Sequence, residues 1–260
     1  MPAHSVIAVQ GYTLRDCCKT VLDIAKTCTR IKKIGYDAVQ VSAWATIPPR
    51  ELRKILDGEG LVCCATHVSW EEASKEPQRV ADEHAILGCR HTAIGSGPGI
   101  WDGSAPRTEA HWSGFARAAS AIARTLQPLG LSFSYHNHAA EFEKVGRRTI
   151  MDVLIEDSIP GTLGLELDTF WVQHGGADPT AYIRKVKDRI PLLHLKDMAI
   201  KDNKIVMAEV GEGNLNWPAI LAAAKEAGVV WYIIEQDTCQ RDPFDSIAIS
   251  LHNLRAMGIA

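Results

Sequence analysis

The chain alternates short apolar runs with longer segments that have the 3.6-residue periodicity of amphipathic helices. The short runs are rich in Val, Ile and Leu, as is typical of strands buried on both faces. Eight of them are predicted as strands: Val6–Gln10, Ala38–Val41, Leu61–His67, His91–Gly95, Leu131–His136, Leu163–Asp168, Leu192–Lys196 and Trp231–Glu235. The clearest helical segments are Val21–Ile34, Arg79–Leu87, Phe115–Leu129, Pro179–Lys187 and Pro218–Ala227.

Glycine and proline mark the ends of the predicted helices. Several helices end in a Gly just before the next strand, where Gly adopts the left-handed conformation at low cost; these residues are Gly35, Gly60, Gly88, Gly130 and Gly228. Proline in the first turn marks helix starts at Pro48-Pro49 and Asp178-Pro179. Eight strand–helix units of about 30 residues predict a (β/α)8 TIM barrel that forms a single domain over residues 1–260. The alternative, an open doubly wound sheet, usually has fewer strands and often a Gly-rich first turn, which this sequence lacks.

Composition and charge narrow the class of protein. The 260 residues are 46% hydrophobic and 23% charged, with a net charge of −3, which excludes a disordered or coiled-coil chain. The lack of a basic excess argues against a nucleic-acid partner. No apolar run approaches 18 residues and no secretory signal is visible, so we expect neither a membrane span nor export. Seven cysteines without a C-x-x-C spacing predict free thiols in a reducing compartment, the cytoplasm.

Ionisable and imidazole side chains gather at the C-terminal ends of the predicted strands, where TIM barrels carry their active sites. They are His67, His136, His138, Asp168, His194, Lys196 and Glu235. Carboxylates and imidazoles that converge on one rim repel one another and lose solvation unless a cation compensates them. This mixture of donors suits a divalent ion such as Mn²⁺, Co²⁺, Mg²⁺ or Zn²⁺. The sequence therefore predicts one divalent metal ion on the rim, with Mn²⁺ as the first choice.

Four segments resemble the xylose-isomerase-like TIM barrel family, whose members are broadly described as sugar phosphate isomerases/epimerases. They are Tyr135–Phe142, Glu166–His174, His194–Asp197 and Glu235–Asp237, and the resemblance extends to Ile31–Val39 and Val210–Trp217. Sugar epimerases of this family hold one divalent ion with Glu, Asp, His and Glu from strands five to eight. The resemblance therefore implies Asp168, His194 and Glu235 as metal ligands.

The first ligand of the family does not match cleanly, because many relatives have Glu where this chain has His136. We take Glu141 as the fourth metal ligand, and His136 and His138 remain alternatives. The first and last glutamates of the family also carry protons on opposite faces of the substrate, which implies Glu141 and Glu235 as the catalytic pair. His138 is an alternative base, because imidazole titrates near neutral pH, and Lys196 is expected to hold a developing oxyanion.

Such a metal site can chelate a sugar carbonyl and its neighbouring hydroxyl, and it can stabilise the enediolate formed when the α-proton leaves. Returning the proton gives epimerisation or aldose–ketose isomerisation, whereas expelling a β leaving group gives a lyase or dehydratase. We therefore predict a divalent-metal-dependent sugar isomerase or epimerase. The alternative is a metal-dependent lyase acting on a keto-sugar, 3-keto-glycoside or inosose. The remote alternative is an abasic-site endonuclease, which shares this barrel but would need three metal ions and a basic surface.

The substrate is expected to be an uncharged sugar or polyol ketone. Rim side chains predicted to contact it are His67, Trp70, His136, Trp171 and His174. The alternative for the two tryptophans is packing between loops. Glycines in 95–99 and 211–213 could present N–H groups to a phosphate, although such runs are more often tight turns. Relatives often form dimers or tetramers, so the resemblance implies a homo-oligomer.

Overall fold

A computed structural model describes residues 7–259, and within that range eight parallel strands close into a barrel. Their order around the barrel is β1-β12-β9-β8-β5-β4-β3-β2. The strands are β1 (Ile7–Gln10), β2 (Ala38–Val41), β3 (Val62–His67), β4 (His91–Ile94), β5 (Ser132–His136), β8 (Gly164–Asp168), β9 (Leu192–Leu195) and β12 (Trp231–Ile234). The predicted (β/α)8 fold class is confirmed. Val6, where the first strand was expected to begin, lies outside the described residues.

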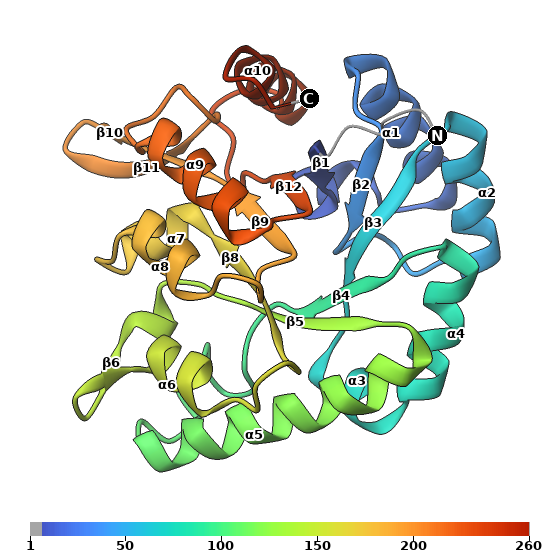
Figure 1. The fold of residues 1–260 in the computed structure, drawn as a ribbon. Coiled ribbons are helices and arrows are strands. Elements are labelled where there is room, and N and C mark those ends of the chain that lie inside the picture. Colours follow the sequence, from blue (N-terminus) through green and yellow to red (C-terminus); the bar gives the residue numbers. More distant parts are fainter. Residues whose placement is uncertain (1–6, 260) are drawn as a thin grey trace.

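Helices surround the ring of strands (Figure 1). The α-helices are α1 (Val21–Ile34), α2 (Pro49–Glu59), α3 (Trp70–Lys75), α4 (Pro77–Leu87), α5 (Glu109–Leu126), α6 (Ile150–Asp157), α7 (Thr169–His174), α8 (Pro179–Lys185), α9 (Trp217–Ala227) and α10 (Pro243–Ala256). Short 3₁₀ turns lie at η1 (Gly11–Cys17), η2 (Gln127–Leu129) and η3 (Ala140–Phe142). β1, β8 and β9 are buried along their whole length, as expected for barrel strands covered by helices on the outside and packed side chains on the inside.

The predicted helix boundaries hold where Gly or Pro marks them. Gly35, Gly60, Gly88 and Gly228 cap α1, α2, α4 and α9 with positive φ, and Gly130 does the same after η2. The largest difference is at α5, which begins at Glu109 rather than Phe115. There the Thr108 side chain accepts the His111 N–H and so provides an N-cap.

Two antiparallel hairpins project from the barrel and were not predicted. One pairs β6 (Lys144–Val145) with β7 (Arg148–Thr149). The other pairs β10 (Asp197–Lys201) with β11 (Lys204–Ala208) directly after β9 (Figure 1). Asp202 and Asn203 form its two-residue turn with φ of 49° and 60°, as a type I′ turn requires.

None of the helices within residues 7–259 is long and apolar enough to cross a membrane. All seven cysteines fall in this range and are free thiols.

Candidate active site

Four side chains from four adjacent strands meet at the C-terminal end of the barrel. His136 and Asp168 end β5 and β8, His194 lies on β9, and Glu235 directly follows β12. Each offers one ligand atom, and these four atoms lie within 4.8 Å of one another. All four residues are buried. We call these four residues the rim cluster.

A second group lies one layer deeper and shares two residues with the rim cluster. It consists of His67, His136, Glu166 and His194, and we call it the inner cluster. Because side chains two residues apart on a strand point the same way, Glu166 lies below Asp168 inside the barrel. Glu166 Oε2 pairs with His67 Nε2 and lies 3.5 Å from His136 Nδ1, and Glu166 Oε1 lies 3.4 Å from His194 Nε2.

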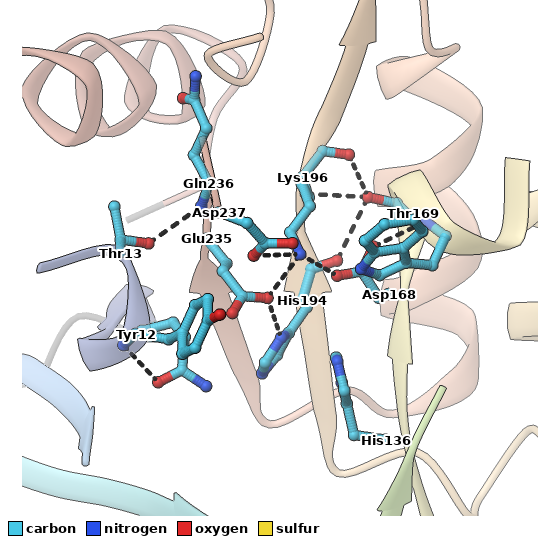
Figure 2. Close-up of polar contacts among 12 residues, drawn as sticks. Tyr12, Thr13, His136, Asp168, Thr169, His194, Lys196, Glu235, Gln236 and Asp237 are labelled. Atoms are coloured by element: carbon cyan, nitrogen blue, oxygen red, sulfur yellow. Dashed lines mark hydrogen bonds and ion pairs between the residues drawn. The ribbon is translucent and has the colours of Figure 1, made fainter. Parts of the chain in front are cut away.

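The ammonium group of Lys196 lies beside the rim cluster (Figure 2). Its Nζ is 3.0 Å from Asp168 Oδ2, 2.9 Å from Glu235 Oε2 and 2.9 Å from Asp237 Oδ1. Burial alone would lower the pKa of Lys196, but attraction to Asp168, Glu235 and Asp237 outweighs burial and raises that pKa. Lys196 therefore keeps a positive charge inside the protein.

The pKa values of the rim-cluster side chains reflect two opposing effects, burial and the attraction of neighbouring charges. Burial raises the pKa of Asp168 to about 6 despite the opposing attraction of Lys196. Burial also acts to raise the pKa of Glu235, but Lys196 and His194 hold it well below its usual range. For His194, the attraction of Glu166 and Glu235 overcomes burial and raises the pKa to about 10. His136 has no such excess of attraction, so burial lowers its pKa well below the usual value.

The rim cluster fits a divalent metal ion. Two imidazoles and two carboxylates form a donor set that transition-metal and related divalent ions accept. His136 Nδ1 and Asp168 Oδ2 are buried without a hydrogen-bond partner, although Lys196 Nζ lies near the latter. Together with Glu166 and Asp237, the carboxylates here outnumber the cationic side chains, so a bound cation would relieve their repulsion.

Glu141, expected as a metal ligand, does not lie with the rim cluster. Its carboxylate is fully buried, and Oε1 accepts a hydrogen bond from Tyr135 Oη at 2.7 Å while Oε2 accepts one from His138 N at 2.8 Å. The 3₁₀ turn η3 directs this side chain toward β5 rather than toward Asp168. His136, one of the two alternatives, is instead the fourth member of the group that could hold an ion.

We expect Glu141→Gln to keep one equivalent of divalent ion per chain, whereas His136→Leu should lose it. Glutamine can still accept one of the two hydrogen bonds, so the main cost should be about 1–3 kcal/mol of folding stability. Metal analysis after dialysis, with thermal unfolding of the same samples, checks both outcomes. Loss of the ion in Glu141→Gln together with retention in His136→Leu would restore Glu141 as the ligand.

A cavity of about 370 Å³ opens over the rim cluster. Its lining includes His67, His136, His138, Glu235 and Asp237, together with Tyr12, Ser42, Ala43, Gly95, Ser96 and Trp101. His138 meets the Trp101 ring edge-on, with centroids 4.6 Å apart, and its Nδ1 has no hydrogen-bond partner. Burial and the nearby Lys196 lower the pKa of His138 to about 3, so its imidazole is neutral.

The remaining residues predicted to contact substrate lie at different distances from the cavity. Trp171 is close to the cluster, with Lys196 Nζ 5.4 Å from its ring centroid and His138 5.3 Å away between ring centroids. Trp70 instead packs against Phe115, and the exposed His174 stacks on Phe170 at the end of α7. Trp70, Trp171 and His174 are all absent from the residues that line the cavity.

The backbone N–H groups of the two glycine-rich segments already donate hydrogen bonds to side chains of the protein. Asp197 Oδ2 accepts hydrogen bonds from the N–H groups of Gly211 at 2.9 Å and Gly213 at 3.0 Å. The Gly97 N–H donates to Tyr135 Oη at 2.9 Å. A phosphate would have to compete with these partners, which favours the expected uncharged substrate.

Three residues of the site were not predicted from the sequence: Glu166, Asp237 and Trp101. The first two carry a usable signal, because each lies two residues from a predicted ligand on the same strand or its extension and so points the same way. Trp101 lies in the loop between β4 and α5, where no periodic pattern indicates its direction.

A family model described as "Xylose isomerase-like TIM barrel" matches residues 28–257. Among curated proteins, the inosose dehydratase of Geobacillus kaustophilus is 25% identical over 188 residues, which is 65% of this chain and 60% of that protein. The chain thus matches less than two thirds of that relative's length. Other matched curated relatives are the inosose dehydratase 1 of Bacillus cereus, 25% identical over 160 residues, and the inosose dehydratase of Clostridium tetani, 23% identical over 180 residues.

Two solved structures share the fold over nearly the whole chain. A sugar phosphate isomerase/epimerase from Parabacteroides distasonis superposes with a TM-score of 0.81 at 22% identity, covering 100% of this chain and 97% of that one. An L-ribulose 3-epimerase gives a TM-score of 0.73 at 18% identity, covering 96% and 93%.

Proposed function

The chain belongs to the xylose isomerase-like TIM barrel family, and on that premise we propose that it is a divalent-metal-dependent enzyme that removes a proton next to the carbonyl of a sugar or polyol ketone. The observation that carries the proposal is the rim cluster beneath a cavity lined by further titratable groups. His136, Asp168, His194 and Glu235 would hold the ion. When bound, it would polarise the carbonyl and the adjacent hydroxyl of the substrate.

The cavity suits a small uncharged substrate. A volume of about 370 Å³ lies at the small end of ligand sites and admits one sugar ring or cyclitol. Among the described residues that line it there is no Arg or Lys, and Lys196 beside the rim cluster is already paired with three carboxylates, so a phosphate would have no unpaired cationic partner there. Trp101 offers an apolar ring face and several hydroxyl and imidazole groups offer hydrogen bonds, which together suit a polyol.

Proton transfer is assigned to groups on two sides of the cavity. His138 follows β5 and Glu235 follows β12, and these strands are separated in the ring by β8 and β9. We assign acceptance of the α-proton to His138, whose imidazole is neutral and whose Nδ1 has no hydrogen-bond partner. Glu235, on the other side, can carry a proton to or from the opposite face. Lys196 holds negative charge that develops on oxygen.

Isomerisation or epimerisation is the outcome that this two-sided arrangement supports, because the proton can return from a different direction. Dehydration is the second candidate, favoured by Asp237 and by the inosose dehydratases among the curated relatives. Burial and the nearby Glu235 raise the pKa of Asp237, which lines the cavity. A carboxyl group with a raised pKa can protonate a departing hydroxyl.

Turnover of a substrate panel tests this function. The metal-loaded protein is incubated with free ketoses, 3-keto-glycosides and inososes, and the products are identified by NMR. An epimer or positional isomer supports the first candidate, and an unsaturated product with loss of water or of a glycosidic group supports the second. If only phosphorylated ketoses were turned over, the uncharged-substrate assignment would be wrong. If no member of the panel reacted, the proposed reaction class would be wrong.

We expect Trp101→Ala to lower kcat/KM on the true substrate by about 5- to 10-fold, because an aromatic contact is worth about 1 kcal/mol. Trp101 is 62% exposed at the mouth of the cavity, so its removal should leave folding stability unchanged. Trp70→Phe is the matched control, since it preserves the packing against Phe115 away from the cavity. Equal kcat/KM values for Trp101→Ala and the parent would contradict a substrate contact.

A further inference from the structure

The two ring nitrogens of His194 face different partners. Nδ1 lies 2.8 Å from Glu235 Oε2, on the side of the rim cluster. Nε2 lies 2.7 Å from Gln40 Oε1 and 3.4 Å from Glu166 Oε1, on the side of the inner cluster. An imidazole that binds a metal ion gives up one ring proton and keeps the other, so it can offer a lone pair in only one direction. Which nitrogen carries that proton decides which cluster can bind an ion through His194.

The chemistry of Gln40 fixes that choice. Its side-chain amide lies between Glu166 and His194, and Glu166 Oε1 is 2.7 Å from Gln40 Nε2. A carboxylate only accepts hydrogen bonds, so the NH₂ group of Gln40 must face Glu166. The amide oxygen of Gln40 then faces His194 and needs a donor there. His194 must therefore carry a proton on Nε2.

We propose that Gln40 and Glu166 are positioning residues that hold His194 with a protonated Nε2 and so present the Nδ1 lone pair to the rim cluster. This inference rests on the proposed metal dependence and adds which of the two overlapping clusters binds the ion. Metal-binding histidines commonly donate their second N–H to a fixed acceptor, which sets the ring orientation. Here the acceptor is an amide that is itself oriented by a buried carboxylate. Gln40 and Glu166 are both fully buried, so water does not compete for these bonds.

The inner cluster then supports the site instead of holding an ion. Filling it would require His194 Nε2 to lose its proton and Gln40 to give up its acceptor role. The Glu166 carboxylate is also engaged by Gln40 and by His67 Nε2. His67 in turn lies 3.2 Å through Nδ1 from Ser42 Oγ, so Glu166 also orients two residues that line the cavity.

A reciprocal exchange of the two side chains tests the inference. Gln40→Leu removes the acceptor and should weaken binding of Zn²⁺ about 10- to 100-fold. In the double variant Gln40→Glu/Glu166→Gln, the new carboxylate at position 40 can accept from both His194 Nε2 and the new amide at position 166. The double variant should therefore bind Zn²⁺ within about 3-fold of the parent affinity. Gln10→Leu is the control, because it removes another buried amide from the register-matched position on β1.

Zn²⁺ affinity is measured by calorimetric titration, and the nitrogens of ¹⁵N-labelled histidines are read by NMR. The parent and the double variant should show Nε2 of His194 protonated and Nδ1 bound to the ion, whereas Gln40→Leu should lose the slowly exchanging Nε2 proton. Parent-like affinity and spectrum in Gln40→Leu, or coordination through Nε2, would overturn the inference. If the parent bound no divalent ion, the metal dependence in the proposed function would be wrong. The His194 Nε2 proton in the metal-free parent and Gln40→Leu would still decide the positioning role.

Discussion

Replacing Asp168 with asparagine is expected to remove stoichiometric metal and to lower kcat by about 10³-fold, since a Lewis acid contributes several kcal/mol to such a reaction. Asp168 has two roles, because it belongs to the rim cluster and its Oδ1 also accepts the Trp171 N–H at the start of α7. Asparagine keeps the second role and weakens the first, since it caps a helix as well as aspartate does. Metal analysis and steady-state kinetics on the same preparation measure both losses.

Asp178→Asn is the matched control for that experiment. Asp178 caps α8 by accepting the Thr180 N–H at 2.8 Å, and it lies outside both clusters. The same chemical change there should leave metal content and kcat at parent values. Full metal occupancy in Asp168→Asn would place the ion elsewhere, and an equal loss in Asp178→Asn would point to a general effect on folding.

Lys196→Gln should separate catalysis from metal binding. We expect kcat to fall by about 10²-fold or more, because a buried positive charge that can hold a developing oxyanion is lost. The ion should bind at least as tightly as in the parent, because Lys196 no longer competes for Asp168 Oδ2 and Glu235 Oε2. Kinetics and calorimetric titration of the metal test the two directions. Weaker metal binding with unchanged kcat would contradict the assigned role.

Removing one member of a buried charge network can cost 3–5 kcal/mol of stability, so thermal unfolding of Lys196→Gln must be followed with and without metal. Lys185→Gln is the control on the outer surface. Lys185 Nζ pairs with Asp152 and Glu156 at 2.8 Å but is partly exposed, so its loss should cost less than about 1 kcal/mol and leave kcat unchanged.

The barrel was predictable because its signals are local. Most strands are short apolar runs, and a Gly with positive φ, such as Gly35 or Gly228, ends the helix before several of them. The hairpin of β10 and β11 lacks the buried pattern of a barrel strand, because only its two ends, Asp197 and Ala208, are buried while its other residues are half exposed or exposed. The start of α5 was not predicted, because its first turn is defined by a side-chain cap at Thr108 rather than by hydrophobic periodicity.

The sequence predicts only those site residues whose position follows from the end of a strand. Asp168, His194 and Glu235 converge because parallel strands bring their C-terminal ends together. The choice between His136 and Glu141 depends on the direction of a side chain within a 3₁₀ turn, which the spacing of five residues does not determine. The place of Trp70 likewise depends on how α3 packs against α5, where Phe115 provides its partner.

Solvent deuterium uptake is the most direct measurement of the central claim, that this protein removes a proton next to a carbonyl at the rim cluster. A ketose or inosose from the panel is incubated in D₂O with the metal-loaded parent, the chelator-treated parent and Asp168→Asn, and the α-carbon is followed by NMR. We expect deuterium at that carbon, or in the product derived from it, with the metal-loaded parent and none with the other two samples. Turnover without deuterium uptake, or equal uptake in all three samples, would contradict it.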